Sequence, residues 1–600
     1  MPESLYEDVV VKKLHDTSNL FASPIDWRDK WIYFLMIDRF NNPAIPNVPD
    51  WNKGNSKRYE GKFEGVREKL DYIKDLGAGA IWLTPVFKNV VPDECHHGYA
   101  IMDFLEVDPR FGTTPADAKA EFKNLVKEAH KKGIYIILDM VINHAGNVFK
   151  YKENGGYRDA VDWSNYKYPI GWRDKNGNPK EDPSNLSHDG YIWPREFQNN
   201  EWFRRQGKGG PIQGDFESLK EFETEYTDIY NDHPVWNLLI RTYKYIIAEY
   251  DIDGFRIDTL RHVEPEFAKT FSSALREFAY KVGKKNFLIY GETKAGEHEI
   301  ATYMGRFTSD EAGITGPDAS LDFPIQWHLV PATKGFAPPT DIEDVYNYRK
   351  KIHKERHLYS THGEASRFFV TFLECHDDYN RYLYTKDVAK YQKQYIMALG
   401  CLFCLQGIPC LYYGSEQGLK GTDDIYEEGY HPSHGRPENV REALWGKQNA
   451  FNKKNPIYKS INQITEVRNN HPAIRYGRQY FRPVSGNNID FGPSKEKGGI
   501  IAFSRILSES EVVIVANTNV ESKFNGWIVV DGRINDDNTK FDVLYSNDPK
   551  TTKSQIDLDS GDINIWDRHN NMTKGWARRI KVELEPMEIK IIAKNQLIPS

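Results

Sequence analysis

Four charged side chains crowd the end of one short apolar segment, residues 251–262 (DIDGFRIDTLRH). Arg256, Asp258, Arg261 and His262 all fall within seven positions of one another. The apolar neighbours predict a buried strand, and a carboxylate or guanidinium beside such a strand is destabilising unless it is paired. Two interpretations are open at this point: a structural ion pair at a strand end, or a catalytic carboxylate kept ionised by the adjacent arginine.

A series of buried strands and amphipathic helices is expected to position this cluster. Helical spacing of apolar residues ends at Gly77 and again at Gly133, and an apolar run follows each glycine. This alternation predicts parallel βα units, and eight of them predict an α/β fold, a (β/α)8 TIM barrel with its chemistry at the C-terminal strand ends. The predicted strands are residues 31–40, 80–86, 134–142, 251–258, 286–290, 319–325, 367–373 and 408–413.

The strand–helix pattern is interrupted once and gives way to another pattern near the C-terminus. The stretch after the third strand is rich in Trp, Tyr, Asn, Gly and Pro and too long for a loop, so we expect an inserted subdomain. Short alternating segments later in the chain predict a C-terminal antiparallel β-sandwich domain. The expected parts are residues 1–144 (N-terminal segment and first part of the barrel), 145–232 (insertion), 233–480 (rest of the barrel) and 481–600 (β-sandwich).

Composition excludes several classes of partner. The net charge of -7 provides no basic footprint for nucleic acid and no polybasic run for a membrane surface. The five cysteines are an odd, sparse set, which predicts a reducing compartment, and we expect Cys401 and Cys404 to be buried rather than metal ligands. The N-terminus lacks the basic and apolar regions of a signal peptide. We therefore expect a cytoplasmic protein, or a secreted one if a signal has been removed.

Three carboxylates are predicted to meet on one rim of the barrel. Asp258 ends the fourth strand, Glu292 follows the fifth, and Asp377 follows the seventh. His144 and His376 stand at two strand ends as well. Because the C-terminal ends of parallel strands share one rim of a barrel, these side chains should lie close together. Three acids on one rim favour the catalytic interpretation over simple packing.

The same strand ends resemble the four signature regions of the α-amylase family of glycoside hydrolases. The resemblance runs from about residue 31 to residue 418 and extends to the order of barrel, insertion and tail domain. Two further short motifs of the family, at the end of its inserted domain and in its sugar-stacking tyrosine loop, are similar to segments here. The matching segments are residues 139–144 (DMVINH), 254–262 (GFRIDTLRH), 291–293 (GET), 372–377 (FLECHD), 214–219 (GDFESL) and 97–99 (HGY).

The resemblance implies a role for each carboxylate. Asp258 would be the nucleophile, Glu292 the general acid/base, and Asp377 a stabiliser of the transition state. A retaining glycosidase places its nucleophile and its acid about 5–5.5 Å apart. Arg256 would keep the nucleophile ionised. The implied substrate contacts are Tyr99, His144, Arg256, Arg261, His262 and His376.

The resemblance also implies a structural calcium ion between barrel and insertion. Its ligands would be Asn143, Asp215 and the backbone carbonyl of His262, which are suitable oxygen donors for a hard cation. For Asn143, capping of a strand end is the alternative.

The resemblance implies a retaining glycosidase that cleaves α-1,4-glucosidic linkages in starch-, glycogen- or maltooligosaccharide-type α-glucans through a covalent glycosyl-enzyme on Asp258. An α-glucanotransferase with the same mechanism and a non-catalytic carbohydrate-binding relative are the alternatives. Two departures leave specificity open: Cys375 stands where the family usually has Asn, and Arg261 where endo-acting amylases have Lys. Candidate aromatic residues for an acceptor-sugar site are Trp163, Trp172, Trp193 and Trp202.

Overall fold

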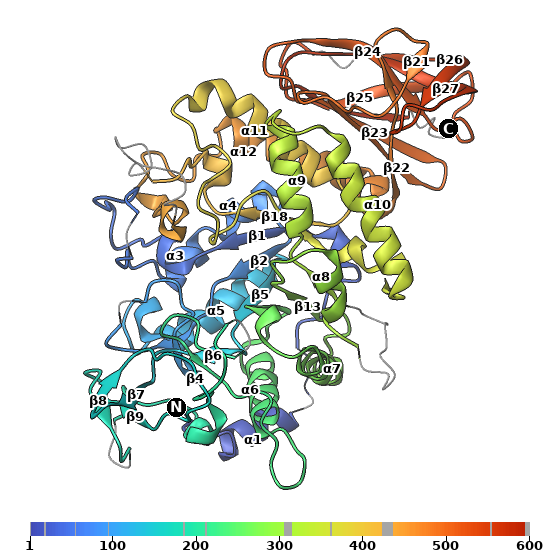
Figure 1. Ribbon diagram of the computed structural model, residues 1–600. Coiled ribbons are helices and arrows are strands. Elements are labelled where there is room, and N and C mark those ends of the chain that lie inside the picture. Colours follow the sequence, from blue (N-terminus) through green and yellow to red (C-terminus); the bar gives the residue numbers. More distant parts are fainter. Residues whose placement is uncertain are drawn as a thin grey trace.

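Eight parallel strands form a barrel at the centre of the protein (Figure 1). Their order around the barrel is β14-β13-β12-β5-β2-β1-β18-β17, and a parallel bridge between Leu321 and Val370 joins the two ends. The predicted (β/α)8 barrel is therefore confirmed. The strands are β1 (Ile32–Leu35), β2 (Ala80–Leu83), β5 (Tyr135–Met140), β12 (Gly254–Ile257), β13 (Leu288–Gly291), β14 (Ala319–Ser320), β17 (Val370–Thr371) and β18 (Ile408–Tyr412).

This computed structural model describes residues 2–16, 18, 20–54, 56–93, 95–183, 187–210, 213–304, 315–360, 363–422, 436–551 and 555–594. Helices surround the barrel strands, and α4 ends at Gly77, whose φ of 104° is a left-handed conformation that glycine adopts without strain. The helices are α1 (Asp8–His15), α2 (Ile37–Phe40), α3 (Phe63–Glu68), α4 (Leu70–Leu76), α5 (Ala118–Lys131), α6 (Pro234–Tyr250), α7 (Pro265–Lys281), α8 (Glu297–Tyr303), α9 (Phe323–Thr333), α10 (Thr340–Glu355), α11 (Val388–Cys404), α12 (Pro456–Asn470) and α13 (Pro472–Tyr476).

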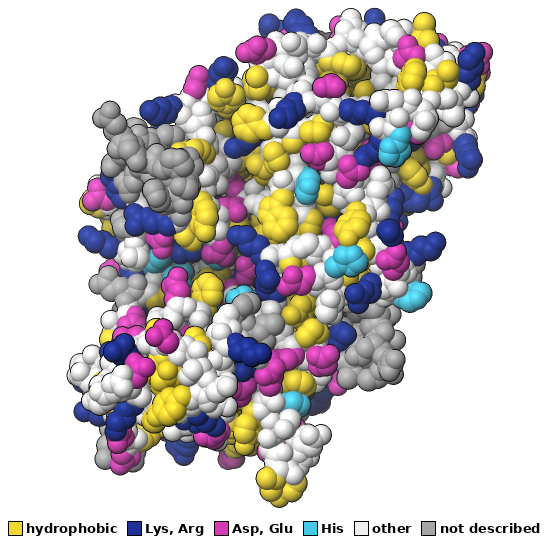
Figure 2. All heavy atoms as spheres, viewed as in Figure 1, with side chains coloured by type: hydrophobic (Ala, Val, Ile, Leu, Met, Phe, Trp, Pro, Cys, Tyr) yellow, Lys and Arg dark blue, Asp and Glu magenta, His cyan; other side chains and the backbone are white. Residues whose placement is uncertain are grey.

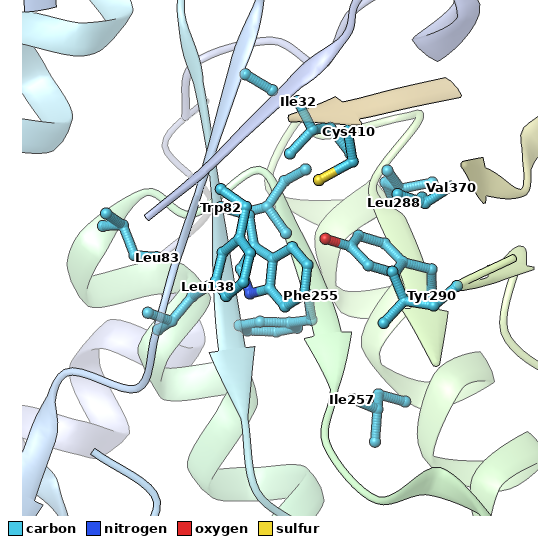
Figure 3. Close-up of a cluster of buried hydrophobic side chains, with 14 of the residues drawn as sticks. Ile32, Trp82, Leu83, Leu138, Phe255, Ile257, Leu288, Tyr290, Val370 and Cys410 are labelled. Carbon is cyan, nitrogen blue, oxygen red and sulfur yellow. The ribbon is translucent and has the colours of Figure 1, made fainter. Parts of the chain in front are cut away.

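The barrel interior is a packed apolar core rather than a channel. Figure 3 shows Trp82 and Tyr290 turned toward each other between the strands. Their ring centroids are 5.9 Å apart in an edge-on arrangement, and Phe34 stacks on Trp82 with a centroid distance of 3.6 Å. Because large side chains fill the centre, access for a ligand is restricted to the ends of the barrel.

Several predicted strands are longer than the observed ones, and in two of them a helix takes up the remainder. The run 31–40 ends as a strand at Leu35, because α2 follows and its Asp38 carboxylate accepts hydrogen bonds from the backbone N–H groups of Tyr59 and Glu60. The run 319–325 ends as a strand at Ser320. Asp322 accepts a hydrogen bond from the N–H of Ile325 and so caps α9. In both cases a buried helix follows the strand, and an apolar run alone does not distinguish the two.

The insertion after the third barrel strand has its own antiparallel sheet, in the order β10-β9-β7-β8. A second pair, β6 and β11, joins the chain leaving the barrel to the chain returning to it. These strands lie within the predicted range 145–232, apart from the first residue of β6. The strands are β6 (His144–Ala145), β7 (Phe149–Glu153), β8 (Gly156–Arg158), β9 (Ile170–Arg173), β10 (Pro179–Lys180) and β11 (Lys220–Glu221).

The C-terminal part is a sheet-rich domain whose strands pair antiparallel, except for β21 beside β26. Alternation along β23 divides its side chains between two cores. Val512 and Ile514 belong to the main core, which is shared with the barrel, whereas Val513 and Val515 belong to the domain's own core. The strands are β19 (Arg478–Phe481), β20 (Val484–Ser485), β21 (Asp490–Phe491), β22 (Ile500–Leu507), β23 (Ser510–Asn517), β24 (Phe524–Val530), β25 (Lys540–Ser546), β26 (Gln555–Trp566), β27 (Met572–Leu584) and β28 (Ile589–Lys594).

The distribution of surface charge and the burial of the cysteines agree with what the composition suggested. On the face in Figure 2, acidic and basic side chains are interspersed rather than gathered by sign. All five cysteines are free and buried, which confirms the predicted burial of Cys401 and Cys404. Within the described ranges, every helix is too short or too polar to cross a bilayer.

A buried lysine anchors the insertion from within. The Lys220 ammonium is fully buried and lies 3.0 Å from Asp215 Oδ2. It is also over the rings of Tyr151 and Phe149, at 4.5 and 5.2 Å from their centroids, and donates to the carbonyl oxygen of Asp159. A buried ion pair of this kind is strongly destabilising when one partner is removed, because the other charge remains desolvated.

We expect Lys220→Met to lower the free energy of unfolding by about 3–5 kcal/mol, since the Asp215 carboxylate would lose its buried cation. Denaturant titration would measure the change. Lys152→Met is the matched control, because Lys152 pairs with Glu181 at the exposed edge of the same subdomain and should contribute little. Equal loss of stability in both variants would contradict a special role for the buried pair.

A second ionic cluster joins the insertion to β4 (Ile101–Val107). The Nε2 atom of His188 lies 2.9 Å from Asp103 Oδ2 and 3.4 Å from Glu106 Oε2. Hydrogen bonds to these two carboxylates raise the pKa of His188 to about 9. Lys88 Nζ adds a further positive charge 2.9 Å from Glu106 Oε2.

The raised pKa of His188 makes its contribution to stability depend on pH. A group whose pKa is higher in the folded state stabilises fully below its unfolded value, about 6.5 for histidine, and loses that contribution as pH rises through the folded value. We expect His188→Gln to be clearly less stable than wild type at pH 6 and closely similar at pH 9.5, in thermal unfolding monitored by circular dichroism. The same difference at both pH values would exclude titration of His188 as its cause.

Candidate active site

A cavity of about 620 Å³ opens at the C-terminal ends of the barrel strands. The predicted carboxylates Asp258, Glu292 and Asp377 all line it. The structure therefore brings together three acids that are up to 119 positions apart in the sequence. Four of the predicted substrate contacts line the same cavity: Tyr99, His144, Arg261 and His262.

A single buried guanidinium connects acids from three adjacent strands. Arg256 on β12 places Nη1 2.8 Å from Asp139 Oδ1 and 2.6 Å from Asp258 Oδ1. Its Nη2 lies 2.8 Å from Glu292 Oε2. The strand register explains this arrangement, because Arg256 pairs directly with Asp139 on β5 and with Tyr290, two residues before Glu292. The sequence interpretation included Asp139 in a motif but missed it as a partner of Arg256.

The electrostatic balance of this group suits acid–base chemistry. Burial raises the pKa of Asp258 above its ordinary value, Arg256 opposes that shift, and the Glu292 carboxyl adds to it. Burial likewise raises the pKa of Asp139 to about 6. One guanidinium faces three carboxyl groups, and ionisation of all three would leave two uncompensated negative charges in a desolvated site. The cluster as a whole therefore favours retaining a proton.

A strained turn after β12 brings a backbone donor to Glu292. Thr259 has φ 46° and ψ 40°, a left-handed conformation that is uncommon for residues with a side chain. Its N–H donates to Glu292 Oε2 at 3.1 Å. The strained turn therefore helps to fix the orientation of Glu292, the candidate acid.

Asp377 is held by an arginine that the sequence interpretation did not include. Arg441 Nη2 lies 3.0 Å from Asp377 Oδ1, and its Nε donates to the carbonyl oxygen of His376 at 3.0 Å. Arg441 follows the 3-10 turn Pro437–Val440, beyond the last barrel strand. It belongs to neither a strand end nor a periodic segment, so no sequence signal marks it.

Tyr99, His144 and His376 form an uncharged group beside the cavity, and Tyr99 and His144 line its wall. Tyr99 Oη donates to Asp139 Oδ2 at 2.7 Å and lies 2.8 Å from His376 Nε2, and the two rings stack. Burial lowers the pKa of His144 to about 3, and it also lowers the pKa of His376. Both imidazoles are therefore neutral near pH 7. Nε2 of His144 is buried without a hydrogen-bond partner of good geometry among the described residues, and the residue lines the cavity.

The two residues that depart from the family pattern, Arg261 and Cys375, have different surroundings. Arg261 lines the cavity, but its Nη1 donates to the carbonyl oxygen of Lys294 at 2.9 Å, and its Nε lies 3.1 Å from Glu299 on α8. The Cys375 thiol is buried, and burial raises its pKa. Its backbone N–H donates to Asp378 Oδ2 at 2.8 Å. The unusual cysteine is thus an uncharged packing residue next to Asp377.

The four tryptophans proposed for an acceptor site are not where they were expected. Of the described residues that line the cavity, none is one of these tryptophans. Trp172 and Trp193 are buried in the core of the insertion, where Trp172 packs edge-on against Phe149. The exposed aromatic side chains of the cavity are instead Phe216 and Tyr379.

The three predicted calcium ligands do not fit a calcium site. Asn143 Nδ2 donates to the carbonyl oxygen of His262 at 2.9 Å, so two of the ligands contact each other directly. Asp215 accepts hydrogen bonds from Tyr151 Oη and from the N–H of Glu221, and it pairs with the Lys220 ammonium. A calcium ion at this carboxylate would lie beside a positive charge. Motif position led to Asp215, but the strand register places Glu221 next to His144 instead.

Of the described His, Cys, Asp and Glu side chains, one group of three lies close enough together to share a metal ion: Asp103, Glu106 and His188. Lys88 and the protonated His188 already balance these two carboxylates. The cluster is therefore accounted for by protein charges alone.

Comparison with known proteins agrees with this arrangement. The family model described as "Alpha amylase, catalytic domain" matches residues 34–477, more than half of the chain. The β/α-amylase of Paenibacillus polymyxa is 29% identical over 516 residues, which are 83% of this chain and 35% of that protein. The α-amylase of Streptomyces lividans is 26% identical over 516 residues, 76% of this chain and 50% of that protein. The chain thus spans half or less of the length of these two relatives.

Solved structures share the fold. An α-amylase from Geobacillus thermoleovorans, complexed with acarbose, has a TM-score of 0.62 and 22% identity, covering 96% of this chain and 100% of that one. CldA, a cyclomaltodextrin glucanotransferase, has a TM-score of 0.65 and 20% identity, covering 95% of this chain and 99% of that one. The family model and the carboxylates on the barrel rim lead to one conclusion: this chain belongs to the α-amylase family of glycoside hydrolases.

Proposed function

We propose that this protein is a retaining glycosidase that cleaves α-1,4-glucosidic linkages in starch-, glycogen- or maltooligosaccharide-type α-glucans. The observation that carries the proposal is that Asp258, Glu292 and Asp377 line one cavity, with Arg256 bound to the first two. A protein that only bound carbohydrate would gain nothing from burying Asp139, Asp258 and Glu292 around one guanidinium.

In this proposal each carboxyl group has a distinct role. Asp258 attacks the anomeric carbon while Glu292 gives its proton to the glycosidic oxygen, so the bond to the leaving sugar breaks as the glycosyl-enzyme forms. Glu292 then removes a proton from water, which attacks the same carbon and releases Asp258. The Asp377 carboxylate stabilises the positive charge that develops on the sugar ring in both steps. Neutral His144 and His376 suit hydrogen bonds to sugar hydroxyls.

Transfer to a sugar acceptor is the second candidate function. The exposed rings of Phe216 and Tyr379 on the cavity favour it, because planar aromatic faces can hold an acceptor sugar. The structural neighbour CldA is described as a glucanotransferase, which agrees with this alternative. With a maltooligosaccharide of defined length, products longer than the substrate would identify transfer, and shorter ones alone would identify hydrolysis.

We expect Glu292→Gln to lower kcat on maltoheptaose by about 10²–10⁴-fold while retaining glucan binding, because the amide keeps the shape but cannot donate the proton. Reducing-sugar release and calorimetric binding would measure the two effects. Glu217→Gln is the matched control, since Glu217 lines the same cavity but is exposed and outside the Arg256 group. Full activity in Glu292→Gln would sink the proposed mechanism.

We expect Arg441→Met to lower kcat by about 10–100-fold with a smaller change in KM, because Asp377 would lose the contact that fixes its orientation. Steady-state kinetics would separate the two parameters. Arg441→Lys should recover part of the activity, since it keeps a cation near Asp377 without the second contact to the His376 carbonyl. An unchanged kcat in Arg441→Met would show that Asp377 needs no such support.

A further inference from the structure

A second cavity, of about 710 Å³, lies where the barrel meets the C-terminal domain. Its barrel side comes from the end of α9, the connection between β17 and α11, and the first turns of α11. Its other side comes from the β21–β22 and β23–β24 connections. In Figure 1, α9 and α11 lie on the side of the barrel that faces the C-terminal sheet, and α11 contacts β23 and β28. Among the described residues, none lines both this cavity and the catalytic one.

Aromatic side chains form much of the barrel side of this cavity. Phe336 is 68% exposed, although a phenylalanine normally packs in a core. Tyr384 and Tyr391 are partly exposed in the same lining. The buried ring of Tyr382 lies beneath the Lys334 ammonium, 4.8 Å from its centroid. Such rings offer flat apolar faces next to polar groups.

One buried donor in the lining has no partner. Gln394 on α11 is 4% exposed, and its Nε2 makes no hydrogen bond among the described residues. A buried amide donor left without an acceptor is unfavourable, so it is normally paired. Gln394 lines the cavity and its Nε2 atom lies just behind the surface, so a bound ligand that draws the amide outward could supply the missing acceptor.

The lining selects the chemistry of that ligand. Lys334, Lys497 and Glu521 offer both donors and an acceptor, so a strongly anionic ligand would meet a carboxylate as well as the two ammonium groups. A purely apolar ligand would leave the Gln394 amide unpaired. A sugar has apolar faces for the rings and hydroxyl groups for the polar side chains, and the cavity volume is within the usual range of ligand sites.

From this combination we propose that the second cavity binds a segment of an α-glucan chain, apart from the catalytic cavity. The inference rests on the proposed function, which supplies the polymer. The connection between β17 and α11 contributes to both places, with Asp377 and Tyr379 on the catalytic cavity and Tyr382 to Thr385 on the second one. The C-terminal domain completes the site through Asn519 and its neighbours.

Adsorption to granular starch at low temperature tests the site, with Glu292→Gln as the parent so that the granule is not digested. Adding Tyr391→Ala should weaken adsorption by about tenfold, and adding Gln394→Leu should weaken it while leaving the melting temperature unchanged, because the amide donor has no protein partner to lose. Trp576→Ala is the matched control, an exposed aromatic residue of the C-terminal domain outside the cavity.

The two proposals fail in different ways. In the wild-type background, Tyr391→Ala should hydrolyse maltotriose at the normal rate, because it does not line the catalytic cavity. If wild type cleaves α-glucans but the cavity variants adsorb like the parent, or the parent does not adsorb, the second site is excluded. If wild type acts on no α-glucan, the proposed function itself fails.

Discussion

The buried guanidinium of Arg256 is the interaction on which the catalytic end of the barrel depends. It lies between Asp139, Asp258 and Glu292, and 5.2 Å from the centroid of the Trp82 ring, where the apolar interior ends. None of these charges could remain buried alone, because each would lose its hydration without compensation. Arg256 therefore contacts both the apolar interior and the acids, so packing of the barrel and arrangement of the acids depend on the same side chain.

Sequence predicted the parts of this arrangement that follow from strand direction. Asp258, Glu292 and Asp377 could be placed on one rim because every parallel strand ends there. The contact between Arg441 and Asp377 could not be predicted, because Arg441 lies far along the chain in a segment with no periodicity. Asp215 shows a different limit. The motif suggested Asp215 as a metal ligand. Its actual partner is Lys220, whose ammonium is buried over the Tyr151 ring of the insertion, and the motif does not reveal this contact.

The C-terminal domain is more than an appended module. Neighbouring residues of β23 enter two different cores, so one face of the sheet is continuous with the barrel's apolar interior. This continuity fixes the domain against α11 and α12, and the second cavity lies beside that contact. A shared core of this type makes a hinge between the two parts unfavourable, since opening it would expose apolar side chains of both.

The five buried cysteines give the folded chain an unexpected chemical inertness. Cys375 stands next to Asp377, yet burial raises the pKa of its thiol, and the same holds for the thiols of Cys95, Cys401, Cys404 and Cys410. Thiolate, not thiol, reacts with alkylating agents and oxidants. The folded protein should therefore resist mercurials and peroxide despite a thiol beside its acids. The rate of thiol alkylation would therefore measure how often the folded structure opens around these cysteines.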